Sequence, residues 1–439
     1  MLIDFKVANF RSFGNEQLFS LVSSRDSSHP GNLIPCDGFS VAKVSAIYGS
    51  NASGKSNLIK AISALQRLVL TSATTMNLGD EIEVSPFRLN AQTRIEPSRF
   101  EITVLIDETT YHYGFSATRE RVQDEWLNVR RSGGRNSQWM ERTFDPAGTH
   151  TNWTLKGPIK KEAELLQSKT RDNGLALSRG AELNIDHLAP LFLWCRNTLR
   201  VLDLSSKPDV QSTARRLISD DSLRSRILNL VRDADFGISS LRVAEVPAFT
   251  DVPANAPLYM RDFISGVTSS VRKITGVTDL TKFSVSTEHF EYPSGQPVQF
   301  SLEEDESNGT QRFFALAGPI IDALDNGLVL VIDELDCSMH PNLTRKIIDL
   351  FNSSELNAKG AQLIFVTHDS SLMDASLFRR DQIWLTEKRQ DGSTDLFSLY
   401  DIDPKKRPRN VESLERNYLS GRYGGVPKFG PVLEDLDVR

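Results

Sequence analysis

The sequence has little of three features that would each define a class of protein: cysteine, long apolar runs and an excess of charge of one sign. Its 439 residues include only three cysteines, Cys36, Cys195 and Cys337. These are too few and too far apart for a disulfide framework or a zinc site. We therefore expect a reduced, cytoplasmic setting.

The scarcity of long apolar runs and the modest charge exclude two further classes. No stretch is long and apolar enough to cross a membrane, and Asp4 and Lys6 interrupt the segment in which a signal peptide needs an apolar core. The formal net charge is only -6, which does not support a surface built to coat nucleic acid but leaves room for a local basic groove. The length predicts two lobes rather than one core. We expect no membrane partner.

The segment "AIYGSNASGKSNLIKAI" contains the pattern G-x-x-x-x-G-K-S. Glycines in such a loop let successive backbone N–H groups point at phosphate oxygens, while Lys55 reaches the terminal phosphates and Ser56 offers a hydroxyl to Mg²⁺. A strand-like run precedes the loop and apolar residues at helical spacing follow it, as the motif requires. The residues predicted to contact the nucleotide are Gly49, Ser50, Asn51, Ala52, Ser53, Gly54, Lys55, Ser56 and Asn57.

Two apolar runs near the C-terminus end in polar side chains. The run "LVLVIDE" is typical of a strand buried on both faces, and it ends in Asp333 and Glu334. Asp333 is placed to bind Mg²⁺ together with Ser56, and Glu334 to polarise the water that attacks a phosphate. The run "LIFVTH" predicts a second buried strand that brings His368 to the same edge, where its imidazole could contact the terminal phosphate.

The remaining segments alternate between sheet-like and helical patterns. "RFEITVLID" and "YHYGFSATRERV" predict a strand pair, and "FSVSTEHFEYPSGQPVQFSL" predicts a hairpin that turns at "PSGQ". Three segments after residue 158 are interpreted as helices: "IKKEAELLQSK", "AELNIDHLAPLFLWCRNTLRVL" and "VQSTARRLISDDSLRSRILNLVRDA". The last of these carries an apolar stripe typical of ordinary core packing.

The order of these pieces resembles the ABC-type ATPases of the SMC, RecF and OLD kind. The matching segments are "GSNASGKS", "ESNGTQR", "VIDELDCSMHP" and "VTHD", and "NFRSF" looks like the family's first strand. The resemblance implies an α/β fold, in which a P-loop NTPase lobe has a mixed sheet with an antiparallel portion and carries an inserted helical arm. It also implies ATP and Mg²⁺ as cofactors and ATP hydrolysis as the activity.

The same resemblance assigns a signature motif that contacts the ATP of a second copy, and so implies a homodimer or higher homo-oligomer with shared ATP sites. The signature contacts implied are Ser307, Gly309, Thr310 and Gln311. Asn308 stands where the usual L-S-G-G pattern has its first glycine, and Glu306 precedes the serine. Residues 337–340 fall in the D-loop. The family's Q-loop glutamine has no secure match, and Gln92 is a candidate by rough position only.

These assignments imply four parts along the chain. They are residues 1–157, the N-terminal part of the ATPase lobe with the phosphate loop; 158–280, the inserted helical arm or lid; 281–400, the C-terminal part of the lobe with signature, acid pair, D-loop and switch histidine; and 401–439, a C-terminal tail.

The short arm, the "SNGTQR" signature and the ending "YLSGRYGGVP" look like the stand-alone bacterial ATPases of the RloA and AbiLi type. That resemblance implies the sensor component of an anti-phage defence system, which controls a separate effector, a nuclease or toxin encoded nearby. The ending is equally compatible with a loop packed on the ATPase lobe and with a tail that docks a partner. The basic run 405–409 is either a solvated loop or a contact for nucleic acid or an acidic partner.

Two other functions are weighed against this interpretation. A DNA-repair or DNA-end-binding ATPase of the SMC and RecF kind is the alternative, but the arm lacks long heptads and a strongly basic stripe. A nuclease of the OLD type would need a further Toprim-like domain after His368, and the sequence that follows is short.

Overall fold

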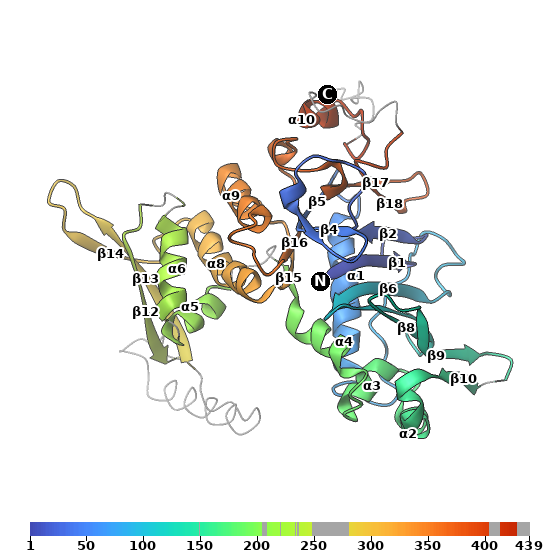
Figure 1. Ribbon diagram of the computed structural model, residues 1–439. Helices are drawn as coiled ribbons and strands as arrows, with labels where there is room; N and C mark the ends of the chain where they lie inside the picture. The colour runs from blue at the N-terminus through green and yellow to red at the C-terminus, as the bar shows by residue number, and fades with distance from the viewer. Residues whose placement is uncertain are drawn as a thin grey trace, which may run out of the picture. The chain divides into compact units, whose positions relative to one another are not determined.

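The structure is a computed structural model in which the chain divides into two units (Figure 1). The first unit comprises Met1–Ser205, Ala323–Cys337 and Pro341–Arg439, and the second comprises Ser206–Asp322 and Ser338–His340. The residues described are 1–148, 150–203, 209–219, 221–232, 234, 237–247, 281–403 and 413–427. Each unit is considered by itself.

The strands of the first unit are β1 Leu2–Ala8, β2 Gln17–Ser20, β3 Leu33–Pro35, β4 Ser40–Ala42, β5 Val44–Gly49, β6 Ser98–Ile106, β7 Thr109–Ala117, β8 Val122–Arg131, β9 Ser137–Asp145, β10 His150–Leu155, β11 Leu199–Asp203, β15 Val329–Asp333, β16 Gln362–Val366, β17 Ile383–Lys388 and β18 Thr394–Ser398. Its α-helices are α1 Lys55–Thr71, α2 Ala163–Lys169, α3 Ala176–Glu182, α4 Ala189–Leu193, α9 Pro341–Asn352 and α10 Leu414–Leu419. Its shorter helical turns are η1 Pro30–Asn32, η2 Gly157–Glu162, η3 Trp194–Thr198, η4 Ser370–Leu372 and η5 Arg380–Gln382.

Two large sheets organise this unit. In the antiparallel sheet the strands lie in the order β10-β9-β8-β7-β6-β1-β2, and in the other the order is β11-β15-β16-β5-β17-β18. In the second sheet only β18 runs antiparallel to its neighbour. Every residue of β5, β15 and β16 is buried, which explains why apolar residues dominate their sequences. The α/β fold class with parallel and antiparallel sheets is confirmed.

Helix α1 joins the two sheets into one core. It contacts β1 of the antiparallel sheet and β5, β11 and β15 of the other sheet. Its buried positions include Leu58, Ile62, Leu65 and Val69, which is the helical spacing that the sequence predicted. Because of these contacts, α1, the helix that follows the phosphate loop, is fixed along most of its length. Helix α9 packs against β5 and β16.

The second unit combines helices with a small sheet. Its elements are α5 Val210–Ser219, α6 Asp221–Arg232, β12 Ser240–Pro247, β13 Thr281–Phe290, β14 Pro297–Ser301 and α8 Asn308–Asn326, whose last turn belongs to the first unit. The three strands form an antiparallel sheet in the order β12-β13-β14. The predicted hairpin is thus confirmed, as is the strand pair β6 and β7.

The contacts divide the chain differently from the predicted boundary at residue 158. Helices α2 to α4 belong to the first unit, and only the later part of the predicted arm belongs to the second. The cause is visible at α3, where the buried carboxylate of Glu125 accepts the N–H groups of Ala176 and Leu177 at 2.8 and 3.0 Å. Residues 248–280 of the predicted arm lie outside the described residues.

One predicted helix is wrong at its end. "TLRVLD" forms the strand β11, which pairs in parallel with β15. The side chain of Gln66 on α1 donates to the carbonyls of Cys195 and Leu199, both at 2.8 Å, and so fixes the start of this strand. Pairing with the sheet, which a local pattern cannot reveal, outweighs the helical periodicity of the segment.

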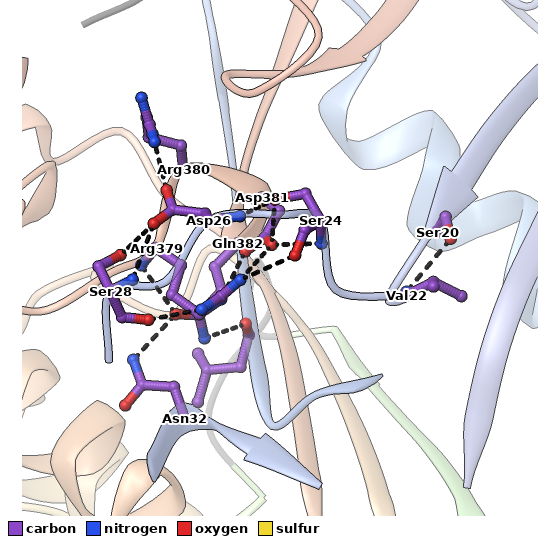
Figure 2. Close-up of polar contacts among 11 residues, drawn as sticks. Ser20, Val22, Ser24, Asp26, Ser28, Asn32, Arg379, Arg380, Asp381 and Gln382 are labelled. Atoms are coloured by element: carbon purple, nitrogen blue, oxygen red, sulfur yellow. Dashed lines mark hydrogen bonds and ion pairs between the residues drawn. The ribbon is translucent and has the colours of Figure 1, made fainter. Parts of the chain in front are cut away.

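A buried polar network ties the segment after β2 to the turn η5 (Figure 2). The Arg379 guanidinium makes two hydrogen bonds to the Asp381 carboxylate, at 2.9 and 2.8 Å, and its side chain is only 1% exposed. Asp381 also accepts the N–H of Ser24 at 2.7 Å. The neighbouring Gln382 donates to the carbonyl of Val44 at 2.8 Å. The network therefore supports β5, the strand that leads into the phosphate loop.

We expect Arg379→Met to lower the free energy of unfolding by about 3–5 kcal/mol, because it leaves a buried carboxylate without its ion partner. The control is Arg389→Met, which breaks the exposed pair with Asp395 and is expected to cost less than about 1 kcal/mol. Urea unfolding followed by intrinsic tryptophan fluorescence measures both. Equal losses would show that the Arg379 pair has no special role.

Candidate active site

The predicted motif residues of the first unit meet where three parallel strands end. Strand β16 lies between β5 and β15, so the phosphate loop, the acid pair and His368 all follow the carboxyl ends of neighbouring strands. In open α/β sheets this edge is where ligands bind.

The two glycines of the phosphate loop are required by close packing. A Cβ on Gly49 would lie 2.6 Å from the carbonyl oxygen of Thr386, and a Cβ on Gly54 would lie 2.8 Å from Cγ2 of Thr394. Both glycines also have positive φ, 154° and 114°, which side chains rarely allow. The loop is therefore pressed against β17 and β18, and only glycine fits at these two positions.

The loop leads directly into the N-terminus of α1. Gly54 is the N-cap, and no side chain caps the helix, so the first N–H groups depend on another acceptor. The N-terminus of a helix carries partial positive charge and favours an anion. Asn51 and Ala52 are exposed at the loop's rim, while Ser53 is buried and its carbonyl accepts the hydroxyl of Thr394 at 2.7 Å.

Lys55 is the buried cation of the loop. Its side-chain nitrogen donates to the carbonyls of Gly49 and Ser50 at 2.7 and 3.0 Å. Burial lowers the pKa of Lys55 to about 8, against the opposing effect of nearby carboxylates, Asp333 foremost. An ammonium held in this way gains strongly from a bound polyanion, because the anion restores the charge balance that burial disturbs.

Asp333 connects the acid pair to the loop. The hydroxyl of Ser56 donates to its Oδ1 at 3.2 Å. Burial raises the pKa of Asp333, and the neighbouring carboxylates Glu334 and Asp203 raise it further, whereas the bond from Ser56 lowers it. A carboxylate in such surroundings is stabilised by a cation placed next to it.

Glu334 sits in an unusual backbone conformation. Its φ is 57°, in the left-handed region that non-glycine residues seldom adopt and that is found most often at functional sites. Strand β15 holds the chain before Glu334. The chain after it is held because the N–H of Leu335 donates to Val366 O at 3.1 Å and that of Cys337 to Glu334 O at 3.0 Å. The backbone from which the half-buried Glu334 side chain extends is therefore held in place, one residue beyond the end of β15.

His368 is exposed at the end of β16. Its backbone N–H donates to the Asp336 carboxylate at 3.2 Å, and the N–H of Thr367 donates to Ile47 O on β5 at 3.2 Å. The histidine is therefore anchored on one side to the acid segment and on the other to the strand that enters the phosphate loop.

The signature residues lie at the start of α8 in the second unit. The Ser307 hydroxyl accepts the N–H of Thr310 at 3.1 Å and so caps the helix. A Cβ on Gly309 would lie 2.6 Å from the carbonyl oxygen of Ser338, which explains the glycine. Gln311 donates to the carbonyls of Glu303 and Glu306, at 3.2 and 3.0 Å. Ser307 and Asn308 are exposed.

The structure thus brings together the predicted residues of the first unit, and it places the signature residues in the other unit. Gln92 is exposed in the segment between α1 and β6, where its side chain donates to Glu96 at 2.7 Å. Gln92 therefore does not lie at the end of a strand of the parallel sheet. On the outer side of β15 that position is taken by Asp203, at the end of β11.

Several residues of the site were missed from the sequence. Asp203 is the register partner of Asp333 on the neighbouring strand. Ser12, Thr386 and Thr394 support the phosphate loop through hydroxyl contacts. "LRVLD" ends in an acid as "LVLVID" does, but Arg200 interrupts its apolar residues and it continues a helical pattern without a Gly or Pro break. No local sequence pattern marks Ser12, Thr386 or Thr394 as contacts of the loop.

The described part of the chain contains no group of three or more His, Cys, Asp and Glu side chains that could hold a metal ion by themselves. A magnesium ion at Ser56 and Asp333 would need further ligands from water and phosphate, which is the usual way in which Mg²⁺ is bound. No helix among these residues is long and apolar enough to cross a membrane.

Comparisons with solved structures give similarity at low identity. The structure described as "Crystal structure of the SmcHead bound to the C-winged helix domain of ScpA" is 14% identical, with a TM-score of 0.39, and covers 90% of this chain and 97% of its own. "Structure of the recombination mediator protein RecF-ATPrS in RecFOR pathway" is 14% identical, with a TM-score of 0.29, and covers 90% and 98%. A search among curated proteins found no match.

A family model gives the firmest comparison. The model described as "AAA domain, putative AbiEii toxin, Type IV TA system" matches residues 44–374, three quarters of the chain. The matched range begins with β5 and includes the phosphate loop, the signature, the acid pair and His368. The chain therefore belongs to this family of AAA domains, described as putative AbiEii toxins of type IV TA systems.

Proposed function

We propose that this chain is an ABC-type ATPase that binds and hydrolyses ATP with Mg²⁺ at sites shared between two copies. We further propose that it is the sensor component of a bacterial anti-phage defence system of the RloA and AbiLi type, controlling a separate effector. The observation that carries the ATPase proposal is the contact between Ser56 and Asp333 at 3.2 Å, next to the glycine loop and Glu334.

Binding rests on the loop and the start of α1. The backbone N–H groups from Gly49 to Asn57 would surround the β- and γ-phosphates, and the Lys55 ammonium would exchange its carbonyl contacts for phosphate oxygens. Ser56 and Asp333 would hold Mg²⁺, which supplies charge neutralisation on the phosphates. The raised pKa of Asp333 fits this role, since burial first and the neighbouring carboxylates second disfavour its charged form, and a bound cation would offset both effects.

Hydrolysis rests on Glu334 and His368. Glu334 would accept a hydrogen bond from the attacking water and turn its lone pair toward the γ-phosphate. His368 would donate to a γ-phosphate oxygen and thereby respond to its presence. Both side chains follow strands that are hydrogen-bonded within the same sheet, so their separation from the loop is set by the backbone.

The shared site rests on the second unit. Ser307 and Asn308 are exposed at the capped start of α8, where a helix N-terminus favours an anion. In the ABC-type arrangement this surface would cover the γ-phosphate of ATP bound to another copy. ATP would then join two chains and hydrolysis would separate them, which is a two-state switch.

The defence role rests on the family and on the inventory of side chains. The family is described as "AAA domain, putative AbiEii toxin, Type IV TA system", which supports a place in such a system. Because the side chains assigned above all belong to ATP handling, we assign the toxic activity itself to a separate effector. The alternative is a DNA-repair or DNA-end-binding ATPase of the SMC and RecF kind. Among the described residues of the second unit, α5 and α6 have ten and twelve residues, which is too short for a long coiled coil. The basic run 405–409 lies outside the described residues and supports neither function.

ATP affinity should fall as the pH rises above about 8. The pKa of Lys55 in the free protein is lowered to about 8, so at higher pH the side chain must take up a proton to pair with phosphate, and ATP itself is already fully ionised. Isothermal titration from pH 7 to 9.5 measures this dependence. Lys55→Ala should bind ATP weakly and with little dependence on pH over that range; an unchanged ATP affinity in this variant would contradict the loop assignment.

Two inactive variants should restore activity when they are mixed. Lys55→Ala lacks nucleotide binding and Ser307→Arg obstructs the partner's γ-phosphate, so a mixed dimer has one intact site. For random pairing we expect about a quarter of the parental ATPase rate. Differently tagged chains verify that mixed dimers form. Mixed dimers without phosphate release would contradict the shared site.

The purified chain should hydrolyse ATP and leave DNA and RNA intact, since its assigned chemistry belongs to ATP alone. Glu334→Gln should stop phosphate release and accumulate ATP-dependent dimers, detectable by size-exclusion chromatography, because the size is kept while the base is lost. Linear DNA, plasmid, tRNA and total RNA are incubated with each variant in Mg²⁺ or Mn²⁺. Cleavage that survives Glu334→Gln would overturn the effector model, and normal turnover in this variant would exclude Glu334 as the base.

A further inference from the structure

The residue before the signature serine is held by the small sheet of the second unit. Oε1 of Glu306 accepts the hydroxyl of Thr287 at 2.5 Å and lies 2.7 Å from Nε2 of His289. Thr287 and His289 are two positions apart on β13, so they share one face of the strand. The Glu306 side chain is 10% exposed, and Thr287 is fully buried.

Strand β13 is itself a fixed support. It pairs with β12 on one side and β14 on the other. The side-chain amide of Gln211 on α5 makes two hydrogen bonds to the backbone of Phe283, accepting from its N–H at 2.7 Å and donating to its carbonyl at 2.9 Å. The His289 ring meets the Phe300 ring of β14 edge to face, with centroids 5.0 Å apart.

The turn between β14 and α8 is held from both ends. On the strand side, the N–H of Leu302 donates to Val285 O at 3.0 Å. On the helix side, Gln311 donates to the carbonyls of Glu303 and Glu306. Ser307 lies between these two attachments, and its direction relative to β13 depends on the Glu306 side chain.

The chemistry of Glu306 is suited to a clamp. A nearly buried carboxylate is costly unless donors satisfy it, and here both donors come from one strand and meet at one oxygen. Loss of this oxygen would leave the Thr287 hydroxyl and the His289 N–H without their acceptor, and it would free the turn to rotate. Glu306 stands where the usual L-S-G-G pattern has leucine, a side chain that cannot accept a hydrogen bond.

We propose that Glu306 is a positioning residue for ATP hydrolysis, and that Thr287 and His289 of β13 set the orientation of the signature through it. This inference rests on the proposed shared ATP site. Glu306 acts on the partner's nucleotide through Ser307, without touching it. The three-stranded sheet is then part of the hydrolytic machinery, because its geometry determines how Ser307 and Gly309 meet the γ-phosphate.

The test compares Glu306→Ala with Glu306→Gln. Alanine removes the acceptor and should lower the ATPase rate at saturating ATP by about tenfold to a hundredfold, the usual cost of a group displaced by about an ångström. Glutamine keeps an Oε1 that can accept both hydrogen bonds, so its rate should stay within about threefold of the parent. His289→Phe keeps the ring against Phe300 but removes the donor, and it should fall between the two.

Two controls separate positioning from damage to the fold. Gln299→Ala changes an exposed side chain on β14 and should leave the rate unchanged. The ATP affinity of dilute Glu306→Ala, measured by titration, should stay within about twofold of the parent, because its own phosphate loop is intact. Mixing Glu306→Ala with Lys55→Ala should restore activity, since the mixed dimer pairs an intact loop with an intact signature.

Each outcome decides the proposal. A Glu306→Ala rate equal to that of Gln299→Ala would overturn it, and so would a Glu306→Gln rate as low as that of alanine. Lost ATP affinity, or no recovery on mixing, would show that the variant is misfolded and that Glu306 is merely structural. A parent chain without ATPase activity would instead refute the proposed function, independently of Glu306.

Discussion

The candidate site depends on the backbone pairing of β16 with β5 on one side and β15 on the other. This pairing brings together segments almost three hundred residues apart in the chain, the phosphate loop and the acid pair. Because the three strands are parallel and fully buried, the side chains that follow them start from one rigid edge. The contact between Ser56 and Asp333 follows directly from this arrangement.

A few residues of the site lower the stability of the folded chain, and the contacts around them offset this loss. Lys55 is a buried cation with a lowered pKa, Asp333 a carboxylate with a raised one, and Glu334 a non-glycine residue at positive φ. Each is unfavourable alone. Two sets of contacts offset this. Hydroxyl groups of β17 and β18 hold the phosphate loop, and the network around Arg379 supports β5.

In the second unit, the signature turn is held in a different way from the glycine loop of the first. This turn is ordered by side chains rather than by a large sheet, with Glu306 joined to β13 and Gln311 joined to the turn's carbonyls. Side-chain attachments of this kind are easier to rearrange than a buried parallel sheet. Under the proposed shared site, these attachments would orient the signature toward the partner's nucleotide.

The sequence by itself predicted the α/β fold class, and it located the glycine loop after β5, the acids that follow β15 and His368 after β16, because glycine spacing and apolar runs are local signals. It failed at β11, where pairing with β15 decided the outcome. It also gave no sign that Glu125 attaches α3 to the first unit. Asp203 and the clamp on Glu306 were equally hidden. Their partners are distant in the sequence, and only the tertiary structure brings a second strand's side chains within hydrogen-bonding distance.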